Sequence, residues 1–412
     1  GDSDGDFLRV AKEQCTAQIS INDSFALPSE PAIRITSGKP IYCCPHGFIY
    51  RHITESDFYT MEKTWSELID NSDVNPLFMG WHWMMSWWKN WGRTLNLSLK
   101  VTLIFDRDTL IGILPFYSYK KNFLVQYQFI GNAWGLAPTV RSEYSSPIFH
   151  KDKANVLYES LKSYISSTPM NTSFLFPDTQ GNNMPGLSVW QHRIDSGYKI
   201  DVSGRFDDYL PSLGRMTRLK AFNRRSYLLE HYPDVQFVEL PLNTQQIDDF
   251  FNTLNSFHLL RWGKPCFSFQ AVAFHKQLLS VSKDIKGLLS YLKIDKHVIS
   301  ASYNLQVKDV IYNIQSGYLE DFDKKISLGT LHMGWVIEQA FKSDGIKYFD
   351  FLAGFGRVED YKRHYRGYIV EFLTLQYFSS RLIGSIYSGY YLSKVSIRRV
   401  MNLLRLPFAG RL

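Results

Sequence analysis

The chain has 412 residues, of which 45% are hydrophobic, 21% charged and 16% aromatic. These values fit a globular protein long enough for two or three domains, and they exclude an intrinsically disordered chain. The net charge of +7 indicates an anionic partner without choosing among a phosphate-bearing cofactor, a nucleic acid and a membrane surface. Because no run of about 18 apolar residues occurs, we expect no membrane-spanning helix.

Residues 1–49 precede the regular part of the chain, and we expect them to form an N-terminal extension. They contain no apolar segment of the kind that a signal peptide needs. The stretch Cys43–His46 (CCPH) resembles half of a zinc site, but no second Cys/His pair stands at ligand spacing, so we expect no metal. Four cysteines are too few and too irregularly spaced for a disulfide framework, and a reducing cytoplasm fits them best: Cys15, Cys43, Cys44 and Cys266.

The first half of the chain predicts, in order, two helices, a β-hairpin, a strand, a helix and a strand. The second helix ends at Gly92, and the hairpin turns at Asp-Arg-Asp-Thr, residues 106–109, between two apolar and β-branched runs. The predicted elements are 53–72, 82–92, 97–120, 127–132, 151–166 and 172–177.

The second half repeats this order. Two helices are followed by three strands with short polar turns, a helix and a strand, at 244–263, 270–283, 287–319, 327–345 and 347–354. The repeat indicates an internal duplication with a period of about one domain. Between the halves, residues 205–233 are helical in composition and strongly basic from Arg215 to Arg225.

The C-terminal tail is basic, because no acidic residue occurs after Glu371. Its basic residues Arg398, Arg399 and Arg405 alternate with apolar residues at near-helical spacing. This pattern is typical of the solvated face of a terminal helix, and the alternative is an interfacial helix on anionic lipid.

The segment Lys324–Thr330 (KKISLGT) precedes the last helix of the second half. Ser327 can cap that helix, Gly329 allows close approach of a phosphate to the backbone, and Lys325 supplies positive charge. A Ser-x-Gly sequence before a helix is more often only a cap than an anion site.

Two segments of the second half, residues 257–269 and 326–366, together resemble the CelD-like branch of the GNAT acyltransferase superfamily, which is related to FemAB-type transferases. The shared pattern is an Arg-Trp before a Gly and an aromatic, a Ser-x-Gly helix start, an aromatic-Asp-Phe strand between glycines, and a closing Tyr-Lys. In this chain these positions are Arg261, Trp262, Gly263, Ser327, Gly329, Gly345, Asp350, Phe351, Gly354, Tyr361 and Lys362.

The resemblance implies an α/β (α+β) fold with two tandem GNAT-like domains, each a mixed central β-sheet flanked by helices. We expect the extension at 1–49, a first, non-catalytic domain at 50–202, a second domain with the active site at 203–385, and a basic helical tail at 386–412. The chain departs from the family in having Leu328 where a proline is common. It also lacks the Gln/Arg-x-x-Gly-x-Gly loop of acetyl-CoA-dependent GNATs.

Acyl transfer from a thioester to an amine needs a proton acceptor for the amine, donors for the oxyanion and a site for the pantetheine. In GNAT-like sheets the backbone N–H groups of separated strands serve the last two needs, so no covalent nucleophile is required. The absence of a Gly-x-Ser-x-Gly motif agrees with this.

The resemblance implies roles for individual residues. Asp350 accepts the proton or orients the amine, or is a structural partner of Arg261 or Lys362. His258 is a second candidate base or a core histidine. Tyr361 protonates the leaving thiolate or simply packs. The donor-binding residues are expected to be Lys325, Ser327, Leu328, Gly329 and Thr330, and the substrate-binding residues Arg261, Trp262, Gly354 and Lys362.

The leading hypothesis is an N-acyltransferase that takes an acyl group from acyl-CoA or an acyl carrier protein and transfers it to a small-molecule or lipid amine. The acceptor is expected on an envelope lipid, polysaccharide or peptide precursor, and the protein in the cytoplasm or on the inner face of the membrane. One alternative is an aminoacyl-tRNA-dependent FemAB-type transferase, which would make a nucleic acid the partner. Another is a non-catalytic scaffold in polysaccharide or biofilm biosynthesis.

Overall fold

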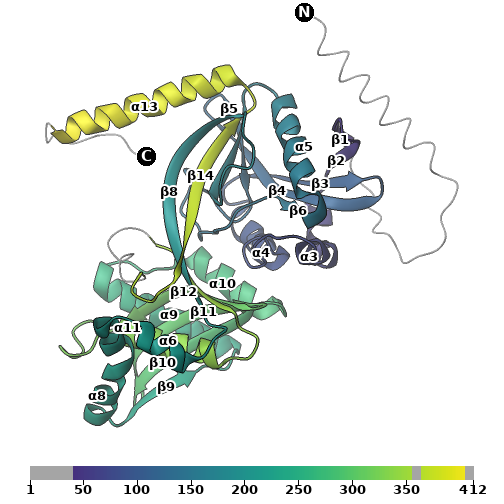
Figure 1. Cartoon of the computed structure of the whole chain (residues 1–412). Coiled ribbons are helices and arrows are strands. Elements are labelled where there is room, and N and C mark those ends of the chain that lie inside the picture. Colours follow the sequence, from purple (N-terminus) through teal and green to yellow (C-terminus); the bar gives the residue numbers. More distant parts are fainter. Residues whose placement is uncertain (1–39, 355–362, 404–412) are drawn as a thin grey trace, which may run out of the picture. The chain divides into compact units, whose positions relative to one another are not determined.

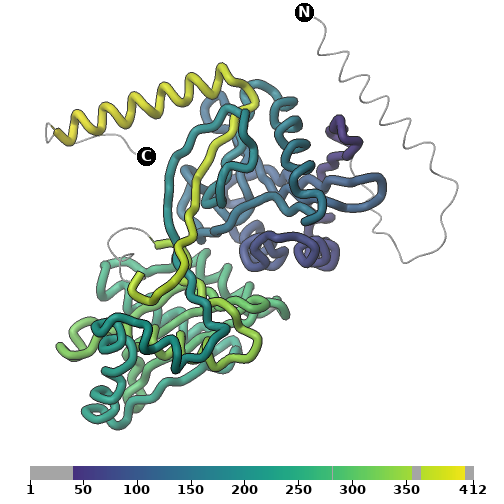
Figure 2. Tube along the Cα trace, viewed as in Figure 1, coloured from purple at the N-terminus to yellow at the C-terminus, as the bar shows by residue number. Residues whose placement is uncertain are grey.

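The computed structural model describes residues 40–354 and 363–403, which form two compact units (Figure 1). Unit 1 comprises residues up to Arg193 and from Leu373 onward, and unit 2 comprises Ile194–Phe372. The chain leaves unit 1 along β8 (Ser188–Asp201) and returns along β14 (Tyr368–Phe378), as Figure 2 traces. We expected the second domain to extend to residue 385, but the chain rejoins unit 1 at Leu373, because the second half of β14 pairs with β7.

The sheet of unit 1 has the strand order β1-β2-β3-β4-β5-β7-β14, with the short β6 beside β4. All its neighbours pair antiparallel except β5 and β7, which run parallel. The strands are β1 (Pro40–Cys43), β2 (Phe48–His52), β3 (Ser98–Asp106), β4 (Thr109–Lys121), β5 (Leu124–Phe129), β6 (Ile148–Phe149) and β7 (Thr172–Thr179).

Helices cover both faces of this sheet (Figure 1). On β4, Phe116 joins the core cluster that contains Leu157 and Leu161 of α5, whereas its neighbour Tyr117 stacks on Trp87 of α4. Successive side chains of a strand point to opposite faces, so α5 and α4 lie on opposite sides. The helices are α2 (Glu55–Tyr59), α3 (Glu62–Asp70), α4 (Trp81–Trp91) and α5 (Ala154–Ser167), the last preceded by the 3₁₀ turn η1 (Lys151–Lys153).

The sheet of unit 2 has the order β8-β13-β12-β11-β10-β9, and β12 and β13 form its parallel pair. Its strands are β9 (Val235–Glu239), β10 (Lys286–Ile294), β11 (His297–Val307), β12 (Val310–Tyr318) and β13 (Tyr348–Ala353). Its helices are α6 (Phe206–Ser212), α7 (Arg215–Arg218), α8 (Arg224–His231), α9 (Thr244–Trp262), α10 (Phe269–Val281) and α11 (Leu328–Lys342), with a π-helical turn η2 (Leu219–Asn223) before α8.

The predicted duplication is confirmed. Two helices, a three-stranded meander, a helix and a strand occur in unit 1 as α3, α4, β3, β4, β5, α5 and β7, and in unit 2 as α9, α10, β10, β11, β12, α11 and β13. The helix predicted at 53–72 was wrong in one respect, because it is divided into α2 and α3. Thr60 ends α2 by donating its hydroxyl to the Asp57 carbonyl at 2.9 Å.

The tail forms the helix α13 (Arg381–Leu403). Within residues 40–354 and 363–403, no helix is long and apolar enough to cross a membrane. At the other end, Cys43 is disulfide-bonded, whereas Cys44 and Cys266 are free thiols. A disulfide was not expected from the cysteine spacing, and it weighs against the reducing compartment that we inferred from it.

Candidate active site in unit 2

The strands β12 and β13 pair over three residues only. Val310, Ile311 and Tyr312 face Tyr348, Phe349 and Asp350, and beyond these positions the two strands no longer pair. We call this point the β12–β13 fork; its arms are residues 313–318 and 351–353. Beyond Tyr312, the backbone N–H and C=O groups of β12 that face away from β11 no longer pair with β13.

Bulges bend both arms of the fork. In β12, Asn304 of β11 faces Asn313 but Tyr303 faces Gln315, which leaves Ile314 without an opposite residue. In β13, the register against β8 slips between Asp350 and Ala353. A bulge bends its strand and re-aims the neighbouring side chains, and bulges are common beside active sites.

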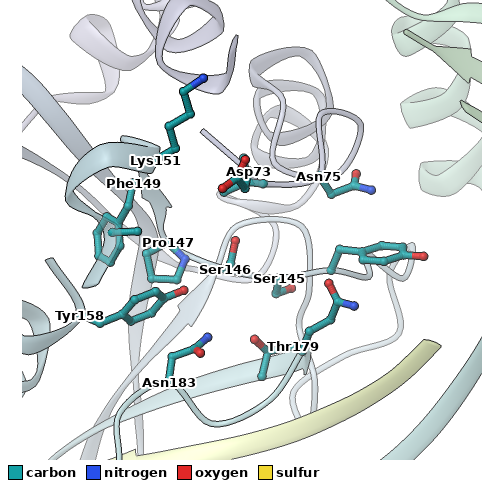
Figure 3. A pocket seen from close by; sticks show the side chains of 14 residues that line it. Asp73, Asn75, Ser145, Ser146, Pro147, Phe149, Lys151, Tyr158, Thr179 and Asn183 are labelled. Atoms are coloured by element: carbon teal, nitrogen blue, oxygen red, sulfur yellow. The ribbon is translucent and has the colours of Figure 1, made fainter. Parts of the chain in front are cut away.

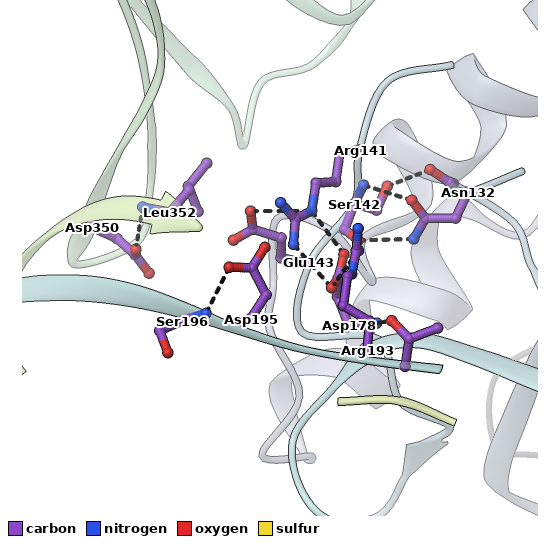
Figure 4. A network of polar contacts seen from close by, with 12 residues as sticks. Asn132, Arg141, Ser142, Glu143, Asp178, Arg193, Asp195, Ser196, Asp350 and Leu352 are labelled. Carbon is purple, nitrogen blue, oxygen red and sulfur yellow. Dashed lines mark hydrogen bonds and ion pairs between the residues drawn. The ribbon is translucent and has the colours of Figure 1, made fainter. Parts of the chain in front are cut away.

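Asp350 lies at the junction of the fork. The residue is only 2% exposed, and its Oδ1 accepts a hydrogen bond from the Leu352 N–H at 2.8 Å (Figure 4). Leu352 has a φ of +62°, a left-handed conformation that is rare for a bulky residue. Such strain persists where the surrounding structure enforces it, and it is concentrated at functional sites. The carboxylate is therefore held in place by a turn of its own strand.

Lys199 of β8 faces Asp350 in the sheet register. Its ammonium lies 4.4 Å from the centre of the Tyr348 ring. Tyr348 is two residues before Asp350 on β13. Lys199 could not be identified from the sequence, because nothing local predicts that β8 pairs with β13.

His258 of α9 contacts the backbone of β12. Its Nε2 is 2.8 Å from the carbonyl oxygen of Ser316, and since a carbonyl can only accept, Nε2 is the protonated nitrogen. Burial lowers the pKa of His258, so the ring is neutral near pH 7. A neutral ring with Nε2–H leaves Nδ1 as the nitrogen that can accept a proton.

Arg261 of α9 is engaged in a structural pair. Its Nε is 2.7 Å from Glu320 Oε1, and Nη1 donates to the Tyr318 hydroxyl at 2.6 Å. The alternative that Arg261 pairs with Asp350 is therefore wrong. The neighbouring Trp262 is 58% exposed, with the Arg261 guanidinium 4.7 Å from its ring centre.

The N-terminus of α11 contains the residues predicted to hold the donor. Ser327 is at the N-cap position, but its side chain does not cap the helix and lies 3.4 Å from the Thr330 hydroxyl. Leu328 is buried in a core cluster, and the Lys325 ammonium lies 5.3 Å from the centre of the Tyr227 ring. The prediction that Ser327 caps the helix through its side chain was wrong.

Gly329 has a packing role that the sequence did not reveal. A Cβ at this position would lie 2.4 Å from a ring carbon of Tyr318, so only glycine allows that tyrosine to pack against the first turn of α11. That side of Gly329 is therefore occupied by protein.

The remaining predicted residues lie at the edge of the described chain. Gly354 follows β13 directly, and Tyr361 and Lys362 lie outside the described residues. Beyond them, Arg363 donates to the Tyr198 hydroxyl at 2.7 Å, and Tyr365 is buried in the core of unit 2.

The basic segment before α9 is tied to α11. Arg225 donates to Glu338 Oε2 at 2.6 Å and stacks its guanidinium 4.1 Å from the centre of the Trp335 ring. A Cβ on Gly334 would lie 2.0 Å from the Ala221 carbonyl oxygen, so the π-turn η2 lies directly against α11. Part of the predicted basic patch thus stabilises unit 2.

Unit 1 has a corresponding fork, because β5 and β7 pair in parallel only up to Gln128 and Leu175. Here the end of β7 is fixed by a buried ionic network (Figure 4). Arg141 binds both carboxylate oxygens of Asp178 at 2.8 and 2.9 Å, and Arg193 binds Oδ1 at 2.9 Å. The Ser145 N–H donates to the Asp178 carbonyl at 3.2 Å, which ties the loop before β6 to β7.

A pocket of about 200 Å³ lies beside this network and is lined by Ser145, Tyr158 and Thr179 among others (Figure 3). The Ser145 hydroxyl is buried and makes no hydrogen bond to any residue in the described part of the chain. The residues that line it include one acid, Asp73, and one cation, Lys151, but no histidine.

Residues 217–363 match the family model of an acetyltransferase (GNAT) domain. The matched segment runs from α7 past β13 and contains Asp350, His258 and the N-terminus of α11. Unit 2 thus carries a GNAT domain, and the chain is an acyltransferase. The domain also implies a donor of the acyl-CoA type.

Among solved structures, FemX is 11% identical, with 79% of this chain and 96% of that chain covered and a TM-score of 0.50. A conserved protein of unknown function from Bacteroides thetaiotaomicron is 11% identical over 81% of this chain and 99% of that chain, with a TM-score of 0.49. A tandem GNAT protein from the clavulanic acid biosynthesis pathway is 7% identical over 81% and 98%, with a TM-score of 0.41. At these identities the likeness is one of fold. No curated protein matches the chain.

Proposed function

We propose that the chain is an N-acyltransferase of the CelD-like branch, which moves an acyl group from a thioester to an amine at the β12–β13 fork. The observation that carries this proposal is the buried carboxylate of Asp350 at the point where the two parallel strands separate. The N–H groups of β12 beyond Tyr312, which no longer pair with β13, are suited to the thioester carbonyl and the pantetheine amides. The N-terminus of α11 would face the phosphates of the donor.

In the proposed reaction the amine nitrogen attacks the thioester carbonyl carbon, the C–S bond breaks, and the sulfur leaves as a thiolate. Asp350 accepts the amine proton or holds the amine in line, and His258 Nδ1 is the second candidate base. Tyr361, outside the described residues, is the proposed proton donor to the thiolate. Trp262, exposed beside Arg261, is the proposed contact for the acceptor.

For the substrates, we propose acyl-CoA or an acylated carrier protein as donor, and an amine on an envelope lipid, polysaccharide or peptide precursor as acceptor. Leu328 and the missing phosphate loop favour a donor other than acetyl-CoA. Unit 1 is proposed to be non-catalytic, since ionic contacts and backbone hydrogen bonds tie down the end of β7 at its fork.

The test is a donor screen with the purified full-length chain. Acetyl-CoA, a long-chain acyl-CoA and an acylated carrier protein are compared by the rise in melting temperature and by thiol release in the presence of model amines. A true donor stabilises the folded protein by mass action, by about 2.7 kcal/mol at a concentration 100 times its Kd. If no thioester stabilises the protein or releases thiol, the proposal fails and the non-catalytic scaffold becomes the better account.

An aminoacyl-tRNA-dependent reaction is the second candidate, because Arg215 and Lys220 are exposed on the basic segment. Arg225 of the same segment is paired with Glu338, which reduces the charge left for phosphates. Retention of tRNA that falls steeply between 50 and 200 mM salt, about 10³-fold or more for six phosphate contacts, would favour this candidate. Retention that does not change with salt would rule it out.

A further inference from the structure

One side of the helix α13 carries a stripe of exposed apolar residues, interrupted by Ser393. Five residues at spacings of four, four, seven and three are each between 51% and 62% exposed: Leu382, Ile386, Tyr390, Ile397 and Val400. At 100° per residue they fall within about 80° of the helix circumference. We call these five residues the α13 stripe.

The opposite side of α13 packs on unit 1. Tyr387 contacts Phe378 with ring centres 5.5 Å apart, and Tyr391 stacks on Trp190 at 5.5 Å. The helix is therefore anchored through one face, and the α13 stripe is not the face that unit 1 covers. Figure 1 shows α13 as a long helix at the end of β14. Single exposed apolar residues are normal on a soluble surface, but five of them on one side of a helix indicate a surface that something covers.

The charges of α13 indicate what kind of surface covers the α13 stripe. The helix contains four basic residues, Arg381, Lys394, Arg398 and Arg399, and no acidic residue. Lys394 keeps its ammonium 4.7 Å from the centre of the Tyr390 ring, beside the stripe. A second copy of the same helix would bring like charges together, which disfavours pairing of two stripes. An apolar stripe bordered by cations matches the boundary between headgroups and acyl chains in an anionic bilayer.

We infer that the α13 stripe lies on the surface of a membrane that contains anionic lipid, with α13 parallel to the bilayer plane. The aliphatic stems of the basic side chains allow their charged ends to reach the headgroups while the stripe enters the acyl region. This inference concerns a surface of unit 1 and does not depend on the acyltransfer proposed for unit 2.

The experiment is flotation of the full-length chain with vesicles of phosphatidylcholine alone or with 30% phosphatidylglycerol. We expect binding to the anionic vesicles only. The double variant Ile386→Asp/Ile397→Asp should lower the partition coefficient at least about tenfold, because it places two charges in the apolar stripe. The double variant Arg398→Gln/Arg399→Gln should lower it about fivefold per charge, about 25-fold together, with the largest difference at low salt.

Met170→Asp is the matched control, because Met170 is also an exposed apolar residue of unit 1 (57%) but lies outside α13. Its partition should equal that of the wild type. Point variants are preferable to deletion of the helix, since deletion would also remove the contacts of Tyr387 and Tyr391. Failure of the wild type to float with either vesicle would overturn the inference. So would a dimer in light scattering that the Ile386→Asp/Ile397→Asp variant converts to a monomer, since the stripe would then be covered by a second copy.

Discussion

The two units contain corresponding parallel strand pairs, β5–β7 and β12–β13, whose ends are stabilised differently. In unit 1, the end of β7 is held by Arg141 and Arg193 on Asp178, and a backbone bond ties the neighbouring loop to it. In unit 2, the β12–β13 fork is bent apart by two bulges, and the acid at its junction bonds to the N–H of Leu352 on its own strand. The buried aspartates thus differ in role. Asp178 holds the end of β7 through Arg141 and Arg193, whereas Asp350 is the proposed proton acceptor.

Asp350→Asn tests whether Asp350 is the proton acceptor, and it has the largest expected effect. The amide oxygen can still accept the Leu352 N–H, so the turn is retained while the proton acceptor is lost. Turnover with the donor identified in the screen should fall by about 10²- to 10⁴-fold, the usual contribution of a general base. Thiol release measures turnover, and the melting temperature of the same variant separates a loss of chemistry from a loss of stability.

Asp201→Asn is the matched control for Asp350→Asn. Asp201 is also on a strand beside β13 and also accepts a nearby backbone N–H, that of Ser203 at 2.9 Å. The Asp201→Asn variant should keep its turnover within about twofold of the wild type. Equal losses in the two variants would mean that Asp350 acts through the fold alone.

Asp178→Asn tests the other half of the comparison. The substitution removes a buried carboxylate from two partly buried guanidinium groups, of which Arg141 keeps a second acid, Glu143 at 3.8 Å, so the free energy of unfolding should fall by about 3 kcal/mol. Tryptophan fluorescence in urea reports it well, because eight of the ten tryptophans are in unit 1. Asp152→Asn, at an exposed acid, should change the same transition by no more than about 0.5 kcal/mol. A stable Asp178→Asn protein with lost turnover would instead make unit 1 catalytic.

Acid should weaken both units, because each contains histidines whose pKa is lowered in the folded protein by removal from water. Burial lowers the pKa of His275 and His332 in unit 2 to about 3, and of His52 and His192 in unit 1 to about 4. The unfolded chain binds protons near pH 6.5 and the folded chain does not, so stability is full above pH 6.5 and falls as the pH drops. For each of these histidines, the free energy of unfolding should fall by about 1 kcal/mol between pH 6.5 and 5.5.

Urea unfolding at pH 7.5, 6.5 and 5.5 measures this loss. His332→Asn, which removes the ring between Ser290 and Ser300, should reduce the pH slope by one proton whatever its effect on stability itself. An unchanged slope would show that His332 is protonated in the folded protein.

Gly329→Ala has the smallest predicted effect and sharpens the assignment of the α11 N-terminus. The new Cβ would displace the Tyr318 ring, so stability should fall by about 1–2 kcal/mol. Gly389→Ala, in α13 with no atom within 4 Å of the new Cβ, should instead stabilise by about 0.5–1 kcal/mol. If Gly329→Ala leaves stability unchanged but weakens donor binding, the role of Gly329 is to let a phosphate of the donor approach the backbone.

The sequence was informative where structure is local. The strand of Asp350 and the helix that ends at Gly263 follow from periodicity and capping, and so does the repeated order of elements. The pairings that decide roles are long-range and left no local signal. Glu320 lies 59 residues beyond Arg261, and the β12 bulge at Ile314 depends on its register with β11. The strand β8 was missed because Ser188–Asp201 mixes polar and apolar residues without strict alternation.

The central claim is that the donor binds at the fork of unit 2, and hydrogen exchange with and without a saturating acyl thioester tests it most directly. The account predicts slower exchange in peptides that cover residues 313–318, 327–331 and 350–353, with no change at 144–147 or 178–183 of unit 1. Slower exchange confined to the unit 1 peptides would contradict it.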